Sequence, residues 1–370
     1  MDNSIFIECF GGIEDKRIDR TKDHSLLDII AITLFAIMSG AQTFEEIEQF
    51  GKLHIKWLQQ FLLLPNGIPS HDTVRRVLGF LDHQQLISSF INWITKIKGL
   101  AKENVIAIDG KTMKGSHSRG KGVKALHVLS AYSCANGLSL GQLKVDGKTN
   151  EITVIPDLIL QLAIEGAIVT IDAMGCQKDI TKAIIEQKSD YIIAVKGNQK
   201  ELYETIVDVF DLAQDKNYTD KMPLQKFEDE IESSHGKIEQ RMITTLPLSS
   251  VAHAVNATEW IGINSVVKVE RRAEDKKGAI TIENRYFISS IYHTEAELIG
   301  RSARLHWSIE NKLHWTLDVV FNEDDCRIRD ETAALNFSWF RKMALSFLKP
   351  AEPFGKKVNS IKKSVYSAAR

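Results

Sequence analysis

The sequence predicts an α/β protein with a mixed sheet, a β-rich insertion and an N-terminal all-α region. Helical patterns fill residues 1–98, and β-branched runs alternate with helical patterns over residues 99–213. Residues 214–292 have the alternating polar character of strands, with Gly- or Lys-rich turns between them. Helical patterns return over residues 293–348, and a basic tail covers residues 349–370. Because a chain of 370 residues is too long for one compact core, we expect two or three domains.

The N-terminal region carries three helix signals. Residues 24–38 are apolar and helix-compatible. Thr43, followed three residues later by Glu46, forms a capping box in front of a second helical pattern. After the turn LPNGIPSHD, a helix with Arg75 and Arg76 is expected, and a further apolar helix follows in LISSFINWITKIKGL. These signals predict a small all-α unit.

From residue 104 the hydrophobic period changes. VIAIDG, ALHVLSAYS and LSLGQLKV are three consecutive predicted strands. A helix with Pro156 near its first turn follows, and then AIVTIDA, KDITKAIIEQKS, YIIAVKG and NQKELYETIVDVF alternate between strand and helix. The order βββ-α-β-α-β-α is typical of a ribonuclease-H-like mixed sheet. In that topology the first and fourth strands are neighbours.

Composition excludes several classes of protein. Hydrophobic residues make up 44% and charged residues 26%, as in an ordinary soluble globular protein. The longest apolar stretch, residues 29–38, is too short to span a bilayer, and no signal peptide precedes it. We therefore expect a cytoplasmic protein. The four cysteines lie far apart, so neither a zinc ribbon nor a disulfide framework is expected; they are Cys9, Cys134, Cys176 and Cys326.

Two aspartates end two of the predicted strands. Asp109 ends VIAID and Asp172 ends AIVTID, while Glu310 lies far downstream in the helix RLHWSIENKLHW. A strand-terminal Asp often caps the following turn. Two of them in one sheet, joined by a helical carboxylate, would instead form a hard-oxygen site for two Mg²⁺ or Mn²⁺ ions. The chemistry expected of such a site is two-metal phosphoryl transfer, which favours an enzyme of nucleic acids.

The surroundings of Glu310 leave alternatives open. His306, Glu310 and His314 stand at i, i+4 and i+8, so one face of the helix would carry two histidines and suggest zinc. The zinc-protease pattern H-E-x-x-H is absent, however. We favour Glu310 as the third ligand of a hard metal. Four acids downstream are rivals, and spacing alone does not exclude the first of them; they are Asp318, Glu323, Asp324 and Asp325. Of the two tryptophans on this helix, Trp315 is expected in the core.

Basic and aromatic residues near these acids are candidate DNA contacts. The net charge of −1 gives no overall attraction to DNA, but residues 111–124 are strongly basic and begin two residues after Asp109. Trp307 suits base stacking as well as packing. The basic tail, by contrast, is more typical of a solvated surface. The candidate DNA contacts are Lys111, Lys114, Lys196, Arg304, His306, Trp307, Lys312 and His314.

Several of these stretches together resemble a known family. IAIDGKTMKGS, KTNEITVIPDL, TIDAMGCQKDI, YIIAVKGNQ and HWSIENKLHWTLDVVFNEDDCRIR resemble the transposases of DDE-type insertion sequences, most closely the H-repeat-associated proteins. The resemblance covers nearly the whole chain and is weakest in the insertion and the last twenty or so residues. It implies that Asp109, Asp172 and Glu310 bind two Mg²⁺ ions in a ribonuclease-H-like core.

One departure from wider cut-and-paste relatives concerns the Glu310 helix. Those relatives carry the signature Tyr-x-x-Arg-x-x-x-Glu-x6-Lys, whose Tyr, Arg and Lys positions are here Ala303, His306 and Leu317. The handling of DNA ends, including any hairpin step, is therefore in question. Arg304, Lys312 and His314 are the residues that we expect to compensate.

The resemblance implies a transposase that nicks DNA at element ends by hydrolysis. The freed 3′-hydroxyl then attacks target DNA in line, without a covalent protein–DNA intermediate. A homodimer is expected because two ends must be cut together, and the helical region with Arg75 and Arg76 is our first candidate for reading DNA sequence. Two other functions remain open: a ribonuclease-H-like nuclease that does not transpose, and a transposase-derived DNA-binding protein without activity.

Overall fold

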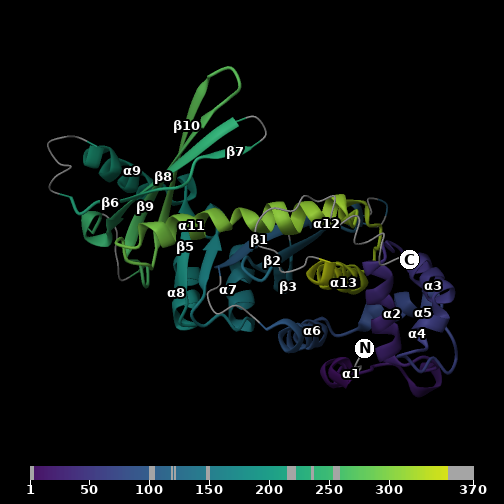
Figure 1. Cartoon of the computed structure of the whole chain (residues 1–370). Coiled ribbons are helices and arrows are strands. Elements are labelled where there is room, and N and C mark those ends of the chain that lie inside the picture. Colours follow the sequence, from purple (N-terminus) through teal and green to yellow (C-terminus); the bar gives the residue numbers. More distant parts are fainter. Residues whose placement is uncertain are drawn as a thin grey trace. The chain divides into compact units, whose positions relative to one another are not determined.

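The computed structural model shows a mixed α/β protein with two compact units (Figure 1). Unit 1 comprises Met1–Ala101, Gly110–Lys148 and Glu310–Arg370, and unit 2 comprises Lys102–Asp109 and Thr149–Ile309. The structure describes residues 4–99, 105–117, 120, 122–146, 151–214, 222–234, 237–252 and 259–348. The predicted basic tail, residues 349–370, and parts of the predicted basic run 111–124 lie outside the described residues.

Unit 1 combines helices from both ends of the chain with strands from its middle. Its helices are α1 (Ser4–Phe10), α2 (Leu26–Met38), α3 (Phe44–Leu53), α4 (Ile55–Leu58), α5 (His71–Phe80), α6 (His83–Lys98), α12 (Trp315–Val319) and α13 (Glu331–Leu348), with a π-helix over Ile309–His314 at its border. Its strands are β2 (Leu126–Ser133), β3 (Leu138–Val145) and the end of β1 (Val105–Met113), in the order β3-β2-β1.

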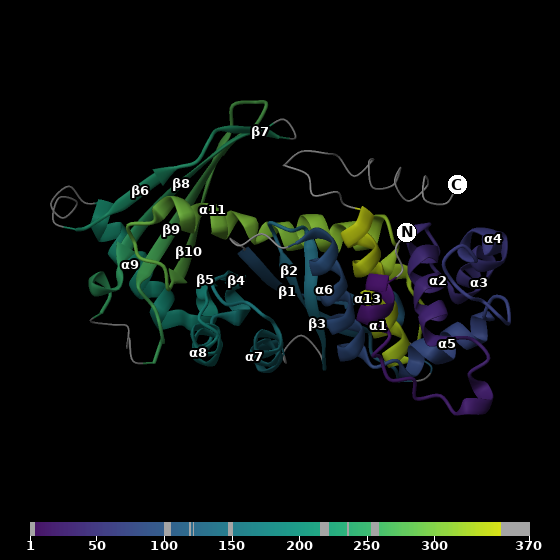
Figure 2. The same cartoon turned by 60° about the horizontal axis from the view of Figure 1, so that its bottom comes forward.

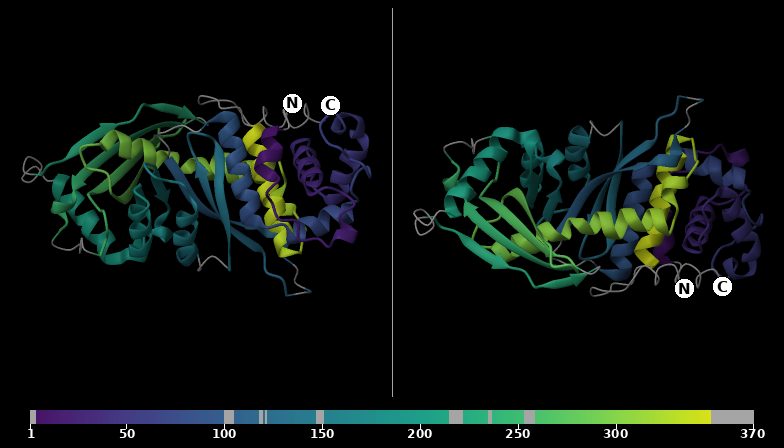
Figure 3. Two further views of the ribbon diagram at one scale, coloured as in Figure 1. Left: turned by 90° about the horizontal axis from the view of Figure 1, so that it is seen from below. Right: turned by 90° about the horizontal axis from the view of Figure 1, so that it is seen from above.

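The core of unit 1 is organised around α13. This helix buries residues on nearly every side, including Phe337, Trp339 and Phe340, as expected of a central helix. It packs against α2 and α5, and both views of Figure 3 show it beside the N-terminal helices. Phe337 meets Phe44 edge to face, with ring centroids 5.6 Å apart. The N-terminal helices therefore share one core with the last helix of the chain.

A chain of buried hydrogen bonds crosses this core. The Lys342 ammonium donates to Ser130 Oγ at 2.7 Å and to Gln142 Oε1. Gln142 Nε2 lies 3.2 Å from His83 Nε2, and His83 Nδ1 lies 2.7 Å from Asn336 Oδ1. Asn336 Nδ2 then donates to the carbonyls of Leu78 and Leu81, both at 2.9 Å. Every donor finds an acceptor only if His83 is neutral, with its proton on Nδ1.

The neutral His83 predicts an acid-sensitive fold. Burial lowers the pKa of His83 from 6.5 to about 4, against the opposing hydrogen bond to Asn336. Between these pH values the unfolded chain binds a proton that the folded chain does not. The free energy of unfolding is therefore expected to fall as pH drops from 6.5 to 4, by at most about 3 kcal/mol. Urea unfolding of the wild type and His83→Gln across this range measures the effect; equal pH slopes would contradict it.

Unit 2 holds the start of β1 and the rest of the strands. Its helices are α7 (Glu151–Gln161), α8 (Lys178–Glu186), α9 (Lys200–Gln214) and α11 (Ala296–Leu305). Its further strands are β4 (Ile168–Ile171), β5 (Asp190–Val195), β6 (Gln225–Glu228), β7 (Glu232–Ser234), β8 (Lys237–Pro247), β9 (Ser265–Glu274) and β10 (Ile280–Ser289). Their order is β1-β4-β5-β10-β9-β8-β6, with β7 beside β8, and β1, β4 and β5 are parallel.

The strands after α9 extend the core sheet of unit 2. β10 pairs antiparallel with β5, so Tyr286 stands opposite Val195. α9 covers one face through the aromatic contacts of Tyr203 and Phe210 with Tyr286. α11 covers the other face, where Gly300 approaches β8 so closely that a Cβ would lie 2.5 Å from Ile243 Cγ1 (Figure 2). Alternate residues of β8–β10 therefore face two different helices.

Most predicted elements agree with the structure. The capping box is confirmed: Thr43 Oγ1 accepts from the Glu46 amide, and Glu46 in return accepts from the Thr43 amide. The predicted start of α7 is wrong, because the helix begins at Glu151 and Pro156 lies inside it. No disulfide joins the four cysteines, all of which are described. Among the described residues, no helix has the length and apolar character needed to cross a membrane.

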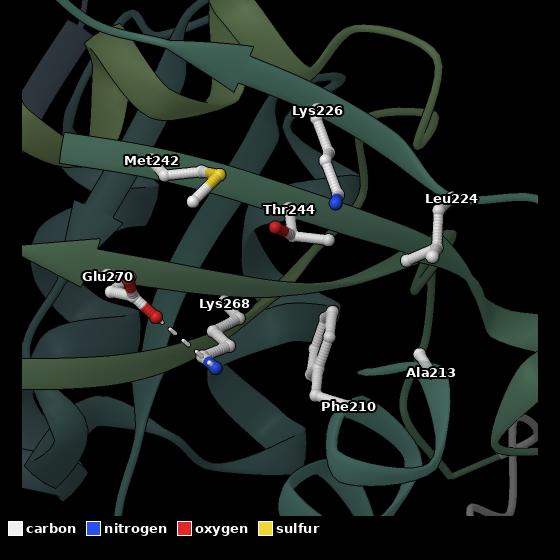
Figure 4. A pocket seen from close by; sticks show the side chains of 8 residues that line it. All are labelled: Phe210, Ala213, Leu224, Lys226, Met242, Thr244, Lys268 and Glu270. Carbon is white, nitrogen blue, oxygen red and sulfur yellow. Dashed lines mark ion pairs between the residues drawn. The ribbon is translucent and has the colours of Figure 1, made fainter. Parts of the chain in front are cut away.

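A cavity of 350 Å³ lies in unit 2 beside α9 (Figure 4). Lys268, only 6% exposed, and Lys226 line it, and the Lys268 ammonium lies 3.7 Å from the Glu270 carboxylate. The other lining residues are Phe210, Ala213, Leu224, Met242 and Thr244. None of the predicted site residues lines this cavity.

Candidate active site

Asp109 and Asp172 lie on two neighbouring strands of unit 2. Asp172 directly follows β4, whereas β1 continues past Asp109 to Met113, so the prediction that Asp109 ends its strand is wrong. β1 and β4 run parallel, and Ile108 stands opposite Ile171. The next residue after each of these isoleucines is an aspartate, so the two acids stand at matching positions where the pairing of β1 with β4 ends. The prediction that the first and fourth strands are neighbours is confirmed.

The two aspartates interact electrostatically. Burial and the charge of Asp109 together raise the pKa of Asp172, against hydrogen bonds from the amides of Met174 and Gly175. Asp172 Oδ1 accepts from the Met174 amide at 3.0 Å and so caps the 3₁₀ turn Ala173–Gly175. The side chain thus caps a turn, as the sequence allows, and also faces a second carboxylate. Two acids in this arrangement favour a cation between them.

His306 belongs to the same neighbourhood in unit 2. Its Nδ1 lies 3.2 Å from Thr170 Oγ1, two residues before Asp172. A positive charge on His306 would lower the pKa of Asp172 and so favours the ionised carboxylate. The structure therefore brings three predicted site residues together: Asp109, Asp172 and His306.

The turn after Asp172 is held by two residues that the sequence analysis did not single out. Asn198 Nδ2 donates to the Ala173 carbonyl at 2.6 Å, and Gln199 Nε2 donates to the Cys176 carbonyl at 2.8 Å. Both follow β5 in the stretch YIIAVKGNQ, so their place directly after a core strand was the available signal. Lys196, two residues before Asn198, is exposed and is therefore accessible to DNA.

The predicted continuous helix around Glu310 is interrupted. α11 ends at Leu305, and residues Ile309–His314 form a π-helix before α12 begins at Trp315. Because π-helical residues bond at i→i+5, the i, i+4, i+8 alignment of His306, Glu310 and His314 predicted from an α-helix is wrong. Glu310 is exposed, whereas His314 is only 8% exposed. The zinc alternative thus loses the regular helix face on which it was based.

Glu310 is the first residue of the last segment of unit 1, Glu310–Arg370, whereas the aspartate pair belongs to unit 2. Among the described residues, no three His, Cys, Asp or Glu side chains are gathered in a way that could hold a metal ion. The donor set of the pair nevertheless fits a hard divalent cation, since carboxylate oxygens are preferred ligands of Mg²⁺. A bound cation would also offset the repulsion that raises the pKa of Asp172.

Arg304 and Trp307, two candidate DNA contacts, are engaged by the insertion strands of unit 2. Arg304 Nη1 lies 3.0 Å from Asp229 Oδ2, and Arg304 Nη2 contacts Glu232. The Arg285 guanidinium lies 4.6 Å from the centre of the Trp307 ring, which is 45% exposed. Trp307 thus offers a ring surface at the end of α11, whereas the charge of Arg304 is balanced by two acids.

Lys111 and Lys114 differ in their access to DNA. Lys111 is 11% exposed at its side chain, and its Nζ lies 2.7 Å from Asp318, 3.2 Å from Asp324 and 3.5 Å from Glu323. Although burial opposes it, these carboxylates raise the pKa of Lys111, with Glu323 contributing most. Lys114 pairs with Asp324 at 2.7 Å but is 79% exposed. Asp318, the rival third ligand, therefore pairs with Lys111.

The remaining candidates on the Glu310 segment differ in exposure. Lys312 is exposed and can reach a phosphate, whereas the burial of His314 favours a packing role. The expectation that Trp315 lies in the core is wrong, because this side chain is 44% exposed. The π-helix explains the error, since it changes which residues of the segment face the core.

Comparison with known proteins places most of the chain in one family. Residues 7–94 match the family model described as DDE_Tnp_1-associated, and residues 100–347 match the model described as Transposase DDE domain. "Putative protein YbfL" of Escherichia coli (strain K12) is 42% identical over 355 residues, covering 94% of this chain and 91% of that protein. "H repeat-associated putative transposase YhhI" of the same strain is 41% identical over 362 residues, with coverage of 94% and 91%.

Among solved structures, "Cryo-EM structure of piggyBac transposase synaptic complex with hairpin DNA (SNHP)" aligns with 99% of this chain and 75% of that chain, at 9% identity and a TM-score of 0.40. The family assignment rests on the sequence matches. Since the Transposase DDE domain model covers residues 100–347, and two full-length relatives exceed 40% identity, the chain belongs to the DDE transposase family.

Proposed function

We propose that this protein is the transposase of a bacterial insertion sequence, which nicks DNA at the element ends and joins them to target DNA. The observation that carries the proposal is the aspartate pair, Asp109 and Asp172, at the point where the pairing of the parallel strands β1 and β4 ends. The match of residues 100–347 to the family model Transposase DDE domain also supports the proposal. Glu310 is proposed as the third acid by its place in the motif.

Asp109, Asp172 and Glu310 would hold two Mg²⁺ or Mn²⁺ ions. Such ions supply Lewis acidity to the attacking and the leaving oxygen of an in-line displacement. The protein's own part is to fix the carboxylates: the 3₁₀ turn and the amide of Met174 orient Asp172, and strand pairing places Asp109 beside it. His306, on the same side of unit 2, favours the ionised form of Asp172.

DNA is the proposed partner, and exposed basic and aromatic residues supply the contacts. Lys114, Lys196 and Lys312 are accessible for phosphates, and Trp307 is accessible for a base. We further propose a homodimer, since two element ends must be processed together, and a cytoplasmic location. The helical N-terminal region, with Arg75 and Arg76, is proposed to read DNA sequence.

The test uses linear DNA carrying the ends of the element that encodes this chain, together with a supercoiled target plasmid, in Mg²⁺. We expect cleavage at the ends and joined products in the target. Cleavage without joining would instead identify a nuclease. Binding that persists in EDTA, with no cleavage in Mg²⁺ or Mn²⁺, would identify a transposase-derived DNA-binding protein.

A further inference from the structure

The contacts of Lys111 in unit 1 do not suit the phosphate-binding role expected from sequence. Its ammonium faces three carboxylates, from Asp318, Glu323 and Asp324, and its side chain is 11% exposed. A DNA phosphate approaching this ammonium would also approach three negative charges. Because like charges at close range oppose binding, Lys111 is a poor DNA contact.

The same contacts join two distant parts of the sequence within unit 1. Lys111 lies on the outgoing part of β1, two residues after Asp109. Asp318 lies in α12, eight residues after Glu310, and Glu323 and Asp324 lie in the 3₁₀ turn that follows. Lys111, Lys114, Asp318, Glu323 and Asp324 are called here the lysine–acid cluster.

The backbone packs as tightly as the charges at this place. Gly115 approaches the turn so closely that a Cβ would lie 2.4 Å from the Asp324 carbonyl oxygen. Arg329 Nη1 donates to the Gly115 carbonyl at 2.6 Å. Met113 and Cys326 share a buried apolar cluster with Leu126, Val128 and Ala334. The end of β1 and the segment after the Glu310 helix are thus fixed to each other by ion pairs, a hydrogen bond and apolar packing.

Glu323 extends the lysine–acid cluster into the core of unit 1. It is 1% exposed and accepts from Ser338 Oγ on α13 at 2.8 Å. A carboxylate so deeply buried requires a partner of opposite charge, and Lys111 is the nearest one on β1. Lys111 therefore connects β1 to a carboxylate that is itself buried against α13.

We propose that Lys111 is a positioning residue of the DNA cleavage reaction, which fixes the segment carrying Glu310 to the strand that carries Asp109. This rests on the proposed function. Lys111 acts through the backbone and not by touching the DNA. It lies two residues after Asp109, and its partner Asp318 lies eight residues after Glu310. A displacement of about 1 Å in a catalytic group costs roughly 10²-fold in rate, so loss of this tie is expected to reduce cleavage by about that factor.

The first experiment compares Lys111→Met with Lys196→Met, whose lysine is exposed at the end of β5. DNA binding is measured against salt concentration, and folding is verified by thermal unfolding. We expect Lys111→Met to keep the salt slope of the wild type, while Lys196→Met lowers it by about 1. A slope lowered by about 1 in Lys111→Met would show that Lys111 contacts a phosphate and would overturn the proposal. This readout does not depend on cleavage.

The second experiment is a double-mutant cycle on the cleavage rate with Lys111→Met and Asp318→Asn. Because both changes break one tie, the double variant is expected to be about as slow as Lys111→Met alone. Lys111→Arg is expected to recover most of the rate and covers the case in which Lys111→Met folds poorly. The proposal would be overturned if the losses of cleavage rate in the two single variants multiply in the double variant. It would also be overturned, in favour of Asp318 as a metal ligand, if Asp318→Asn loses Mg²⁺ binding while Lys111→Met retains it.

The two proposals fail in distinguishable ways. If Asp172→Asn cleaves like the wild type, the proposed active site is wrong. The salt slopes, and a double-mutant cycle of Lys111→Met and Asp318→Asn measured on the free energy of unfolding, then still decide the role of Lys111. If Asp172→Asn is inactive while Lys111→Met and Lys111→Arg both cleave at the wild-type rate, only the positioning role is wrong.

Discussion

Asp172→Asn is expected to slow DNA cleavage strongly while leaving the fold and DNA binding intact. The variant removes one of the two carboxylates that lie where the pairing of β1 with β4 ends, and with it part of the proposed metal site. Loss of about 4 kcal/mol of transition-state stabilisation corresponds to a rate roughly 10³-fold lower. The measurement is the single-turnover rate of end cleavage in Mg²⁺, with DNA binding measured separately in EDTA.

The same variant should not destabilise the protein in the absence of metal. Burial and the charge of Asp109 raise the pKa of Asp172, so its ionised form is unfavourable in the folded state. A neutral amide removes that repulsion, and asparagine can still accept from the Met174 amide. In EDTA the melting temperature is expected to equal or exceed that of the wild type. Mg²⁺ should raise the melting temperature of the wild type and not that of Asp172→Asn.

Asp157→Asn is the matched control for this experiment, because Asp157 lies exposed on α7 of the same unit. It should cleave like the wild type and respond to Mg²⁺ like the wild type. Glu310→Gln and Asp109→Asn belong in the same series. A Glu310→Gln variant with normal Mg²⁺ binding and normal cleavage would remove Glu310 from the site, and an active Asp172→Asn variant would contradict the proposal as a whole.

The sheet around the aspartates was predictable because its signals are local. β-branched runs that lead into Ile-Asp predict the paired parts of β1 and β4, and the predicted order of strands and helices implies the pairing that places Asp109 beside Asp172. The capping box of α3 is equally local, since Thr43 and Glu46 stand three residues apart. Where residue type and short spacing determine the structure, sequence reasoning was sufficient.

The conformation of the Glu310 segment was not predicted correctly from the sequence. An α-helical period predicts one face with His306, Glu310 and His314, but the segment is π-helical over Ile309–His314. The period of the apolar residues does not report such a change of helix type. Trp315 was misplaced for the same reason, since it is exposed although it is large and apolar.

Ion pairs between residues far apart in the chain could not be predicted from the sequence either. Lys111 and Asp318 are far apart in the chain, and each had a plausible local interpretation, one as a phosphate contact and the other as a metal ligand. Only the fold shows that they pair at 2.7 Å. The pairing of β10 with β5 is a similar case, because the hydrophobic pattern of a strand does not determine which strand it pairs with.

Asn336→Leu is expected to cause the largest loss of stability in unit 1. The Asn336 side chain is fully buried and serves three partners: His83 Nδ1 and the carbonyls of Leu78 and Leu81. Leucine has a similar volume but neither donates nor accepts, so these groups would be left without partners in the core. At about 1–3 kcal/mol for each buried unsatisfied group, we expect a loss of roughly 3–5 kcal/mol, allowing for partial relaxation.

The measurement is the free energy of unfolding in urea, with Asn92→Leu as the control. Asn92 lies exposed on α6, in the same unit, so its replacement should change stability by less than about 0.5 kcal/mol. Asn336→Asp separates hydrogen bonding from volume. It keeps the acceptor for His83 but loses the donor to Leu78 and Leu81, so it is expected to be destabilised as well. An Asn336→Leu variant as stable as the wild type would show that the hydrogen-bond chain from Lys342 to α5 does not hold α13 to the N-terminal helices. The last helix would then depend on apolar contacts such as that between Phe44 and Phe337.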